Sequence, residues 1–299
     1  MVAMSIPIAY FTVIVIWSTT PLAIKWSAMG SGYAFAVMAR MAIGALLAAL
    51  LVVWLHGGLP LHRRARASYL AAGLGMFGGM LCTYWGAQYI NSGLVSVLFG
   101  LSPLVTSLLA VLWLGERALL PTKVAGMVLG SVGLSVIFAG GTELGGAHAT
   151  VGVAALVVAV LIFSVSLVWI KRIDDDSPPL ATTAGSLLVA LPLFVTAWGL
   201  ADGHFPHAVP VRATAAIVYL GVFGSVVGFA LYYHIIRHLE AGRVALITLV
   251  TPVLALMLGN VANGEPITAR ILLGAGCITT GLAMHQWPAV AALWRDRRG

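Results

Sequence analysis

The stretch Ser92–Pro103, Ser-Gly-Leu-Val-Ser-Val-Leu-Phe-Gly-Leu-Ser-Pro, is matched by the stretch Ala241–Pro252, Ala-Gly-Arg-Val-Ala-Leu-Ile-Thr-Leu-Val-Thr-Pro. Both are apolar, both have glycine at the second position, and both end on a proline that follows a hydroxyl residue. Each leads to a Gly-Glu pair, at Gly115–Glu116 and at Gly264–Glu265, and the two pairs are as far apart in the sequence as the two prolines. Such a match in register predicts an internal duplication.

The composition is that of a membrane protein. Hydrophobic residues make up 61% of the 299 residues, whereas charged residues make up only 8%. A soluble globular domain has about 25% charged residues, so this chain has too few to cover a surface that faces water. The formal net charge of +7 does not indicate nucleic-acid binding, because the basic residues lie in short loops and in the tail rather than on one concentrated face.

A transmembrane helix needs about 20 mostly apolar residues, and apolar runs bounded by charges or by Gly/Pro clusters predict ten such helices. The predicted spans are residues 5–26, 33–55, 68–89, 93–114, 121–139, 151–171, 180–200, 213–234, 242–260 and 267–287. The first run is expected to stay in the protein, since it lacks the basic start and the small-residue cleavage site of a signal peptide. The sequence therefore predicts an all-α integral membrane protein.

Lysine and arginine favour the cytoplasmic side of a membrane, so their distribution predicts the orientation. With a cytoplasmic N-terminus, the inner loops and the tail hold most of the basic residues: Arg63, Arg64, Arg66, Arg117, Lys123, Lys171, Arg172, Arg237, Arg243, Arg295, Arg297 and Arg298. The opposite loops and span ends hold only Lys25, Arg212 and Arg270. We therefore expect a multi-pass protein of the cytoplasmic membrane with both termini cytoplasmic and a basic tail over 288–299.

Further matches extend the duplication over most of the chain. Residues of like type recur in the same order: Trp17, Ser18 and Lys25 with Phe163, Ser164 and Lys171, Tyr84 and Trp85 with Tyr232 and Tyr233, and Gly126 and Gly133 with Gly274 and Gly281. They predict one five-helix repeat over 1–142 and another over 151–287. Because five is odd, the second copy is inverted, which puts Glu116 at the cytoplasmic face and Glu265 at the outer face. Inverted repeats are typical of secondary transporters, whose substrate site lies near the midplane between the halves.

The doubled order of a proline-containing span, a Gly-Glu pair and a glycine-rich span resembles the EamA-type drug/metabolite transporter superfamily over nearly the whole chain. Within it, the sequence most resembles the aromatic amino-acid exporter branch. The resemblance implies export of amino acids or other small metabolites, although relatives carry nucleotide sugars or triose phosphates. It also implies that spans one, three, four, six, eight and nine enclose a central cavity. Its wall would then contain Trp17, Tyr84, Phe99 and Pro252.

The acidic residues all lie in loops or at span ends: Glu116, Glu143, Asp174, Asp175, Asp176, Asp202, Glu240, Glu265 and Asp296. A carboxylate inside the bilayer is the usual device for proton coupling and for binding cationic substrates. Its absence disfavours antiport of cationic drugs and favours facilitated diffusion, although a chain of bound water or His234 could still carry protons.

Two kinds of residue inside the spans predict a substrate site. Mid-span prolines free a backbone carbonyl, which is tolerated where the backbone lines a cavity, and deep aromatic residues can stack on a planar side chain. Met80, Tyr84 and Gln88 share one helical face. The predicted substrate-binding residues are Trp17, Ser18, Tyr84, Gln88, Phe99, Pro103, Trp169, Tyr232, His234, Thr248 and Pro252. The alternatives are packing kinks and, for Trp169, a belt of interfacial aromatic residues.

Arg40 is the one charged residue well inside a predicted span. It either attracts a substrate carboxylate or lies near the outer end of its span, where it snorkels or bonds to backbone carbonyls. His234 likewise either contacts substrate or is a histidine hydrogen-bonded near the cytoplasmic end of its span. We expect no catalytic residue, no metal and no cofactor; a haem, for example, would need two suitably placed histidines inside the membrane.

These features together predict an exporter of amino acids, including aromatic ones, or of similar small zwitterionic metabolites, working by alternating access as a monomer or weak oligomer. An organic-phosphate or nucleotide-sugar carrier is the alternative among transporters, but its cavity would be expected to hold several basic residues. An intramembrane enzyme would need a Ser-His-Asp, HExxH or aspartyl-pair constellation, and none falls within the spans. A receptor without flux is disfavoured by the repeat. The expected partners are a small-molecule substrate and the lipid bilayer, not nucleic acid.

Overall fold

The computed structural model describes residues 5–115, 120–139, 148–201, 203–228, 231–232, 235, 239 and 241–296, without the side chains of residues 56, 241–245 and 288–296. These described residues form helices and no strand. The helices are α1 (Ile6–Ser27), α2 (Tyr33–His56), α3 (Arg63–Gly86), α4 (Ser92–Phe99), α5 (Ser102–Leu114), α6 (Pro121–Phe138), α7 (Ala149–Ile173), α8 (Pro179–Ala201), α9 (Val211–Tyr219), the π-helix η2 (Leu220–Val227), α11 (Ala241–Asn263) and α12 (Ala269–Asp296).

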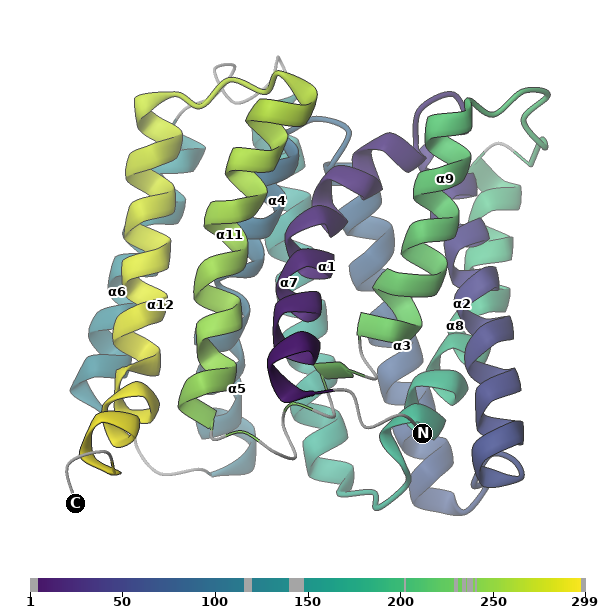
Figure 1. Ribbon diagram of the computed structural model, residues 1–299, viewed down its shortest axis with the longest axis horizontal. Coiled ribbons are helices and arrows are strands. Elements are labelled where there is room, and N and C mark those ends of the chain that lie inside the picture. Colours follow the sequence, from purple (N-terminus) through teal and green to yellow (C-terminus); the bar gives the residue numbers. More distant parts are fainter. Residues whose placement is uncertain are drawn as a thin grey trace.

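The helices stand side by side between two ends of the bundle (Figure 1). α1 begins and α12 ends at the same end, called the terminal end below; the opposite end is called the distal end. α6 and α12 form one edge of the bundle and α2 and α8 the other, with α1, α4, α5 and α11 between them. α3 packs against α7 and α8, while α11 packs against α1, α4 and α12.

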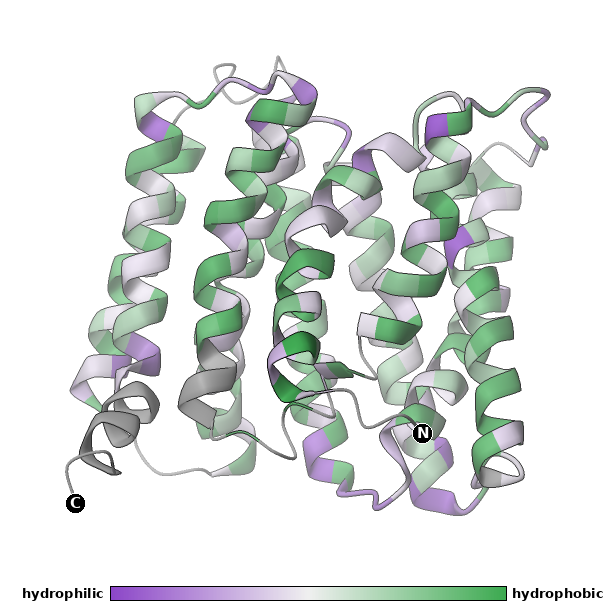
Figure 2. Ribbon diagram, in the orientation of Figure 1, coloured by the Kyte–Doolittle hydropathy of each residue, from purple (hydrophilic) through white to green (hydrophobic). Residues whose placement is uncertain are grey.

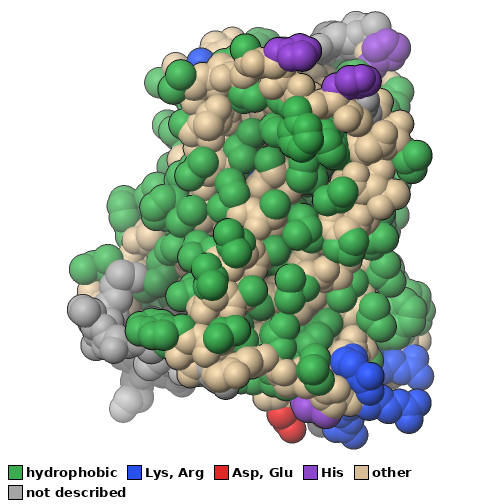
Figure 3. Space-filling model, turned by 90° about the vertical axis from the view of Figure 1, so that its right-hand side faces the viewer, with side chains coloured by type: hydrophobic (Ala, Val, Ile, Leu, Met, Phe, Trp, Pro, Cys, Tyr) green, Lys and Arg blue, Asp and Glu red, His purple; other side chains and the backbone are tan. Residues whose placement is uncertain are grey.

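The sides of the bundle are apolar, and polar residues lie mainly toward its two ends (Figure 2). Within the described residues, seven helical segments are long and apolar enough to cross a membrane. Large apolar side chains such as Trp54, Leu200 and Val261 are exposed. Lys and Arg side chains gather at the lower end of the face shown in Figure 3. A continuous apolar surface of this extent is unfavourable in water, so lipid is the solvent that fits it.

The predicted span 93–114 is broken into two helices. α4 and α5 are separated by a turn at Gly100 and Leu101. Pro103 has no backbone N–H to continue the ladder of helical hydrogen bonds, so the helix restarts with this proline in its first turn. The expected mid-helix bend is therefore a helix break at Pro103, whereas Pro252 lies inside the uninterrupted α11.

The predicted span 213–234 begins as α9 and continues as the π-helix η2. Gly221 allows η2 to approach α2 closely, since a Cβ there would lie 2.7 Å from the Cβ of Ile43. Ser225 spans the widened turn, and its Oγ donates to the carbonyl oxygen of Leu220 at 3.0 Å. π-helical turns are rare and occur frequently at functional sites, so this departure from an ordinary helix marks η2 as a candidate part of the functional site.

α6 and α12 approach each other through glycines. A side chain at Gly281 would begin 2.5 Å from the carbonyl oxygen of Gly126, and one at Gly133 would begin 2.6 Å from that of Gly274. No real Cβ tolerates such contacts with backbone, so the helix pair depends on small residues, as membrane helix pairs often do. These four glycines are the ones that the predicted repeat relates to one another.

Gly281→Val is expected to lower the thermal-unfolding midpoint in detergent by several degrees, because overpacking a close helix contact costs about 1–3 kcal/mol. Gly276→Val is the matched control on the same helix, since nothing lies within 4 Å of the Cβ position at Gly276. Far-UV circular dichroism during heating measures both midpoints. Equal midpoints would contradict a packing role for the glycine contact.

Candidate functional site

A cavity of about 280 Å³ lies among α1, α3, α4, α5 and α11. The five predicted site residues that line it are Trp17, Phe99, Pro103, Thr248 and Pro252. Its walls are mostly aromatic and aliphatic, with serine and threonine hydroxyls between them. Ligand sites typically combine an apolar concave wall with a few polar groups that fix orientation, and this cavity has that composition.

Two further predicted residues adjoin this wall. The ring of Tyr232 lies 4.7 Å from that of Trp17, measured between centroids, which is a favourable separation for aromatic contact. Ser18 follows Trp17 on α1 and is buried, and its hydroxyl has no hydrogen-bond partner among the described residues. Trp17 therefore has an aromatic neighbour on one side and an unsatisfied hydroxyl beside it in the chain.

Tyr84 is buried but does not line the cavity. Its hydroxyl accepts a hydrogen bond from Nη1 of Arg40 at 3.4 Å, and the guanidinium lies 6.0 Å from the centre of its ring. Tyr84 follows the lining residue Thr83 on α3, so it stands one layer behind the cavity wall.

The structure places Gln88 and Trp169 away from the cavity. α3 ends at Gly86, so the helical spacing that groups Gln88 with Met80 no longer holds there. Gln88 is exposed and donates to the carbonyl oxygen of Trp85 at 3.2 Å. Trp169 is 57% exposed because it follows the buried Val168 and is turned about 100° away from it around the helix. His234 lies outside the described residues.

Several lining residues were not among the predicted ones. They extend the predicted positions at helical spacing: Thr20, Pro21 and Ile24 on α1, Met80 and Thr83 on α3, Val95, Ser96 and Gly100 on and after α4, Ser102 on α5, and Thr251 on α11. The i+3 and i+4 spacing from Trp17 and from Phe99 is the signal that could have identified those on α1 and α4.

The hydroxyls of the cavity differ in their availability to a ligand. Those of Thr20 and Thr83 donate to carbonyl oxygens of their own helices, at Ile16 and Gly79, both at 2.7 Å. The hydroxyl of Ser102 has no hydrogen-bond partner within the described part of the chain. An unsatisfied buried hydroxyl is unfavourable, so a polar ligand group that reached Ser102 would be stabilised there.

Arg40 is buried, with 2% of its surface exposed. Besides its bond to Tyr84, its Nε donates to Oγ of Ser225 in η2 at 3.2 Å. The sequence left two interpretations of Arg40 open, attraction of a substrate carboxylate or a place near the outer end of its span with bonds to backbone carbonyls. Its hydrogen bonds instead go to two side-chain hydroxyls. Arg40 does not line the cavity, and among the described residues it has no acidic partner within salt-bridge distance. A guanidinium buried in this way leaves its charge uncompensated inside the bundle.

Comparison with known proteins supplies the family context. The family model described as "EamA-like transporter family" matches twice, at residues 4–139 and 150–285. A protein named "Probable terminal-alkyne amino-acid exporter" from Streptantibioticus cattleyicolor is 29% identical over 91% of this chain and 90% of its own length. An "Uncharacterized transporter" of Archaeoglobus fulgidus is 27% identical over 66% of this chain and 68% of its own length. A solved crystal structure shares the fold, with a TM-score of 0.64 and 23% identity over 94% of this chain and 96% of that one.

Tyr84→Phe is expected to destabilise the protein by about 1.5–3 kcal/mol, because it removes the hydroxyl that accepts a charged hydrogen bond from buried Arg40. Tyr89→Phe is the control: the ring of Tyr89 contacts Trp85 and His148, and its hydroxyl has no hydrogen bond to another described residue. Thermal unfolding in detergent compares the two variants. A Tyr84→Phe midpoint equal to that of Tyr89→Phe would show that the Arg40 bond contributes no stability.

Proposed function

The chain belongs to the EamA-like transporter family, and on that premise we propose that it exports amino acids, aromatic ones included, or similar small zwitterionic metabolites across the cytoplasmic membrane. The observation that carries this proposal is the cavity among α1, α3, α4, α5 and α11, with its aromatic wall at Trp17 and Phe99 and its available hydroxyl at Ser102. The relative named as an amino-acid exporter, which matches nine tenths of this chain, supports the substrate class.

We further propose ten membrane spans in two inverted five-helix repeats, over 1–142 and 151–287, with a basic cytoplasmic tail over 288–299. Two observations support this arrangement. Helical structure lies over each of the ten predicted ranges, and the family model matches the two halves separately. The cytoplasmic position of both termini is supported by the bias of lysine and arginine toward the same side of the membrane.

The electrostatics of the interior favour a substrate with a carboxylate over a cation. Within the described residues, the cavity has no acidic lining residue, and buried Arg40 has no acidic partner. Charges interact strongly where water is scarce, so the uncompensated guanidinium makes the surrounding interior positive. An organic phosphate would also be attracted, but no lysine or arginine lines the described cavity, which ranks phosphate carriers below amino-acid carriers.

The proposed mechanism is alternating access without coupling to protons. The two halves would rock about the cavity and expose it to one side of the membrane at a time. Since no acidic residue falls within the predicted spans, the usual group for proton coupling is missing. The relatives are named as transporters or exporters, and we propose that this chain moves its substrate chemically unchanged rather than acting as an enzyme or a receptor.

Flux into proteoliposomes tests this proposal. Radiolabelled phenylalanine and alanine are expected to enter saturably and to exchange with unlabelled amino acid inside, and collapsing a pH gradient is expected to leave the rate unchanged. Empty liposomes and heat-denatured protein are the controls. Folded protein that shows no saturable uptake of any amino acid, or that is stabilised against heat only by organic phosphates, would refute it.

Trp17→Ala is expected to reduce flux of aromatic amino acids about two- to tenfold more than flux of alanine, since an aromatic contact contributes about 0.5–1.5 kcal/mol. Trp54→Ala is the matched control, because Trp54 is 79% exposed on the outside of α2. Competition between labelled phenylalanine and labelled alanine measures the ratio directly. Equal loss for both substrates would indicate structural damage instead of lost stacking.

A further inference from the structure

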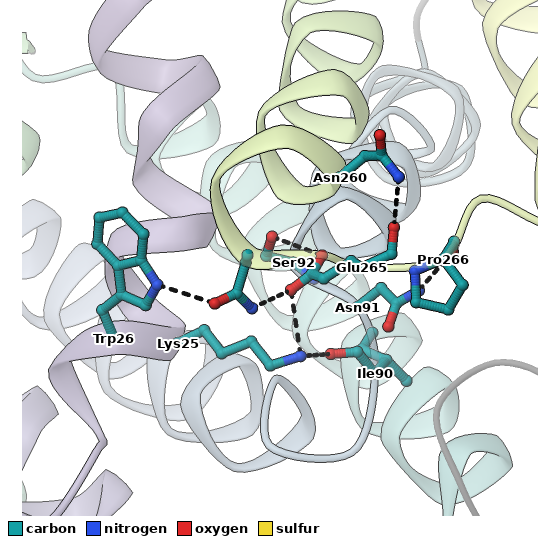
Figure 4. Close-up of polar contacts among 9 residues, drawn as sticks. Lys25, Trp26, Ile90, Asn91, Ser92, Asn260, Glu265 and Pro266 are labelled. Atoms are coloured by element: carbon teal, nitrogen blue, oxygen red, sulfur yellow. Dashed lines mark hydrogen bonds and ion pairs between the residues drawn. The ribbon is translucent and has the colours of Figure 1, made fainter.

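A polar cluster joins three helices at the distal end of the bundle (Figure 4). Nζ of Lys25, at the end of α1, lies 3.3 Å from Oε1 of Glu265 and donates to the carbonyl oxygen of Ile90 at 3.0 Å. Oε2 of Glu265 accepts from the backbone N of Ser92 at 2.7 Å and from its Oγ at 2.8 Å. The carboxylate thus bonds to α1 through one oxygen and to the start of α4 through the other.

Asparagines complete the cluster. Asn263 donates to Oε1 of Glu265 at 2.9 Å and accepts, through its Oδ1, from the indole N–H of Trp26 at 3.2 Å. Asn260 donates to the backbone oxygen of Glu265 at 2.9 Å. Burial alone would raise the pKa of Glu265, but the charge of Lys25 and the hydrogen bonds from its neighbours hold that pKa below its usual value. The carboxyl group of Glu265 is therefore ionised at neutral pH, and its hydrogen bonds fix its position.

This cluster lies next to the cavity along α1 and α4. Ile24 lines the cavity and is followed at once by Lys25, while Val95 lines it one turn after Ser92. The Glu265 carboxylate therefore links the part of α1 just after the cavity, at Lys25, to the part of α4 just before it, at Ser92. A ligand leaving toward the distal end would have to pass between them.

α4 and α11 form a tight unit at this end. A Cβ at Gly93 would lie 2.5 Å from Cα of Leu256, and one at Gly259 would lie 2.5 Å from Oε2 of Glu265 and 2.8 Å from Oγ of Ser92. Such contacts leave no room for the two helices to slide. The bonds of Glu265 to Ser92 therefore join elements already locked by packing.

The end of α1 is attached differently from the α4–α11 unit. It follows an interruption of the helix at Pro21, and side-chain bonds contribute to its attachment. Pro21 lies inside α1 and lines the cavity, and it has no N–H to donate to the carbonyl of Trp17 one turn earlier. The segment after it, residues 22–27, is packed through its buried residues Leu22, Ala23, Ile24 and Ser27. Lys25 and Trp26 add side-chain bonds to the rest of the bundle. The side chain of Lys25 is 24% exposed against 7% for Glu265, so it can become fully hydrated when it leaves, whereas the carboxylate keeps its bonds within the α4–α11 unit.

We propose that the last turn of α1, residues 22–27, is the outer gate of the transporter. Lys25 and Trp26 latch it closed onto Glu265 and Asn263, and this structure holds the latch closed. The gate opens by bending at Pro21, which exposes the cavity to the outside. The inference rests on the proposed function for its orientation and for the alternation between two states.

Labelling of one cavity cysteine tests the gate without any substrate. The reporter is Ser102→Cys, in a chain whose Cys82 and Cys277 are replaced by serine, reconstituted in vesicles of known orientation. A membrane-impermeant thiol reagent is applied from the outside or from the inside. Lys25→Met removes the latch cation and leaves Glu265 bonded to Ser92.

The outer labelling rate is expected to rise about tenfold or more in Lys25→Met, as for loss of one partner of a buried ion pair, while the inner rate falls. The two rates change in opposite directions because the protein is open either to the outside or to the inside, so a larger population of one state means a smaller population of the other. The guanidinium of Arg212 lies 3.7 Å from the centre of the Trp26 ring. Trp26→Phe keeps an aromatic ring for this contact but loses the indole N–H that bonds to Asn263. Trp26→Phe is expected to raise the outer labelling rate less than Lys25→Met does. It also serves as a second test of the gate if Lys25→Met does not fold.

Lys123→Met, at the start of α6, is the control and is expected to change neither rate. An outer rate that stays at the parental value in both latch variants would overturn the gate, and so would a rise from both sides, which signals local unfolding. Amino-acid flux is assayed in separate vesicles of the chain that keeps Ser102 and Lys25, because Ser102 lines the cavity. If flux is absent but the labelling pattern is as expected, the proposed function is refuted and the gate is supported. If flux is normal but labelling is unchanged, the gate is refuted and the proposed function is supported.

Discussion

In lipid, every backbone N–H and C=O must find its partner inside the protein, and the architecture depends on that constraint. Most of the described chain meets it with long helices. In the described chain the ladder is interrupted at Pro21 inside α1, at the turn between α4 and α5, and along η2, and also at Pro252 in α11 and Pro192 in α8. The first two interruptions line the cavity or adjoin it through Gly100 and Pro103. The third reaches it at Gly228, where a Cβ would lie 3.6 Å from Nε1 of Trp17.

The same constraint explains why the cavity and the bendable points coincide. An interrupted ladder leaves carbonyls that a lipid-facing surface could not tolerate but that a cavity can. It also removes the stiffness of the helix at that point. Apart from Pro192 in α8, which does not line the cavity, the interruptions therefore lie around one space. Pairs such as α6 with α12 and α4 with α11 are fixed by glycine contacts that allow little sliding.

Charged side chains inside the bundle are stabilised in two different ways. Lys25 and Glu265 compensate each other within a network of hydrogen bonds at the distal end. Within the described part of the chain, Arg40 bonds to the hydroxyls of Ser225 and Tyr84 and to no carboxylate, so dipoles rather than an opposite charge stabilise it. A compensated pair can separate and re-form as a latch, whereas an uncompensated charge biases which substrates enter. The two arrangements thus suit a gate and a selectivity element.

The sequence by itself determined that this is a multi-span, all-helical membrane protein of a transporter family, because apolar length and repeated motifs are local properties of the chain. The family resemblance and the deep positions of these residues also predicted Trp17, Tyr84, Phe99 and Pro252 as wall residues, and all but Tyr84 line the cavity. Only the tertiary structure decided how each helix is rotated. In lipid, hydrophobicity does not distinguish the inner face of a helix from the outer one, so Trp169 turned outward and Gln88 fell beyond its helix. The pairing of Lys25 with Glu265 across 240 residues was likewise beyond the sequence, because it depends on where α1 and α11 end in space.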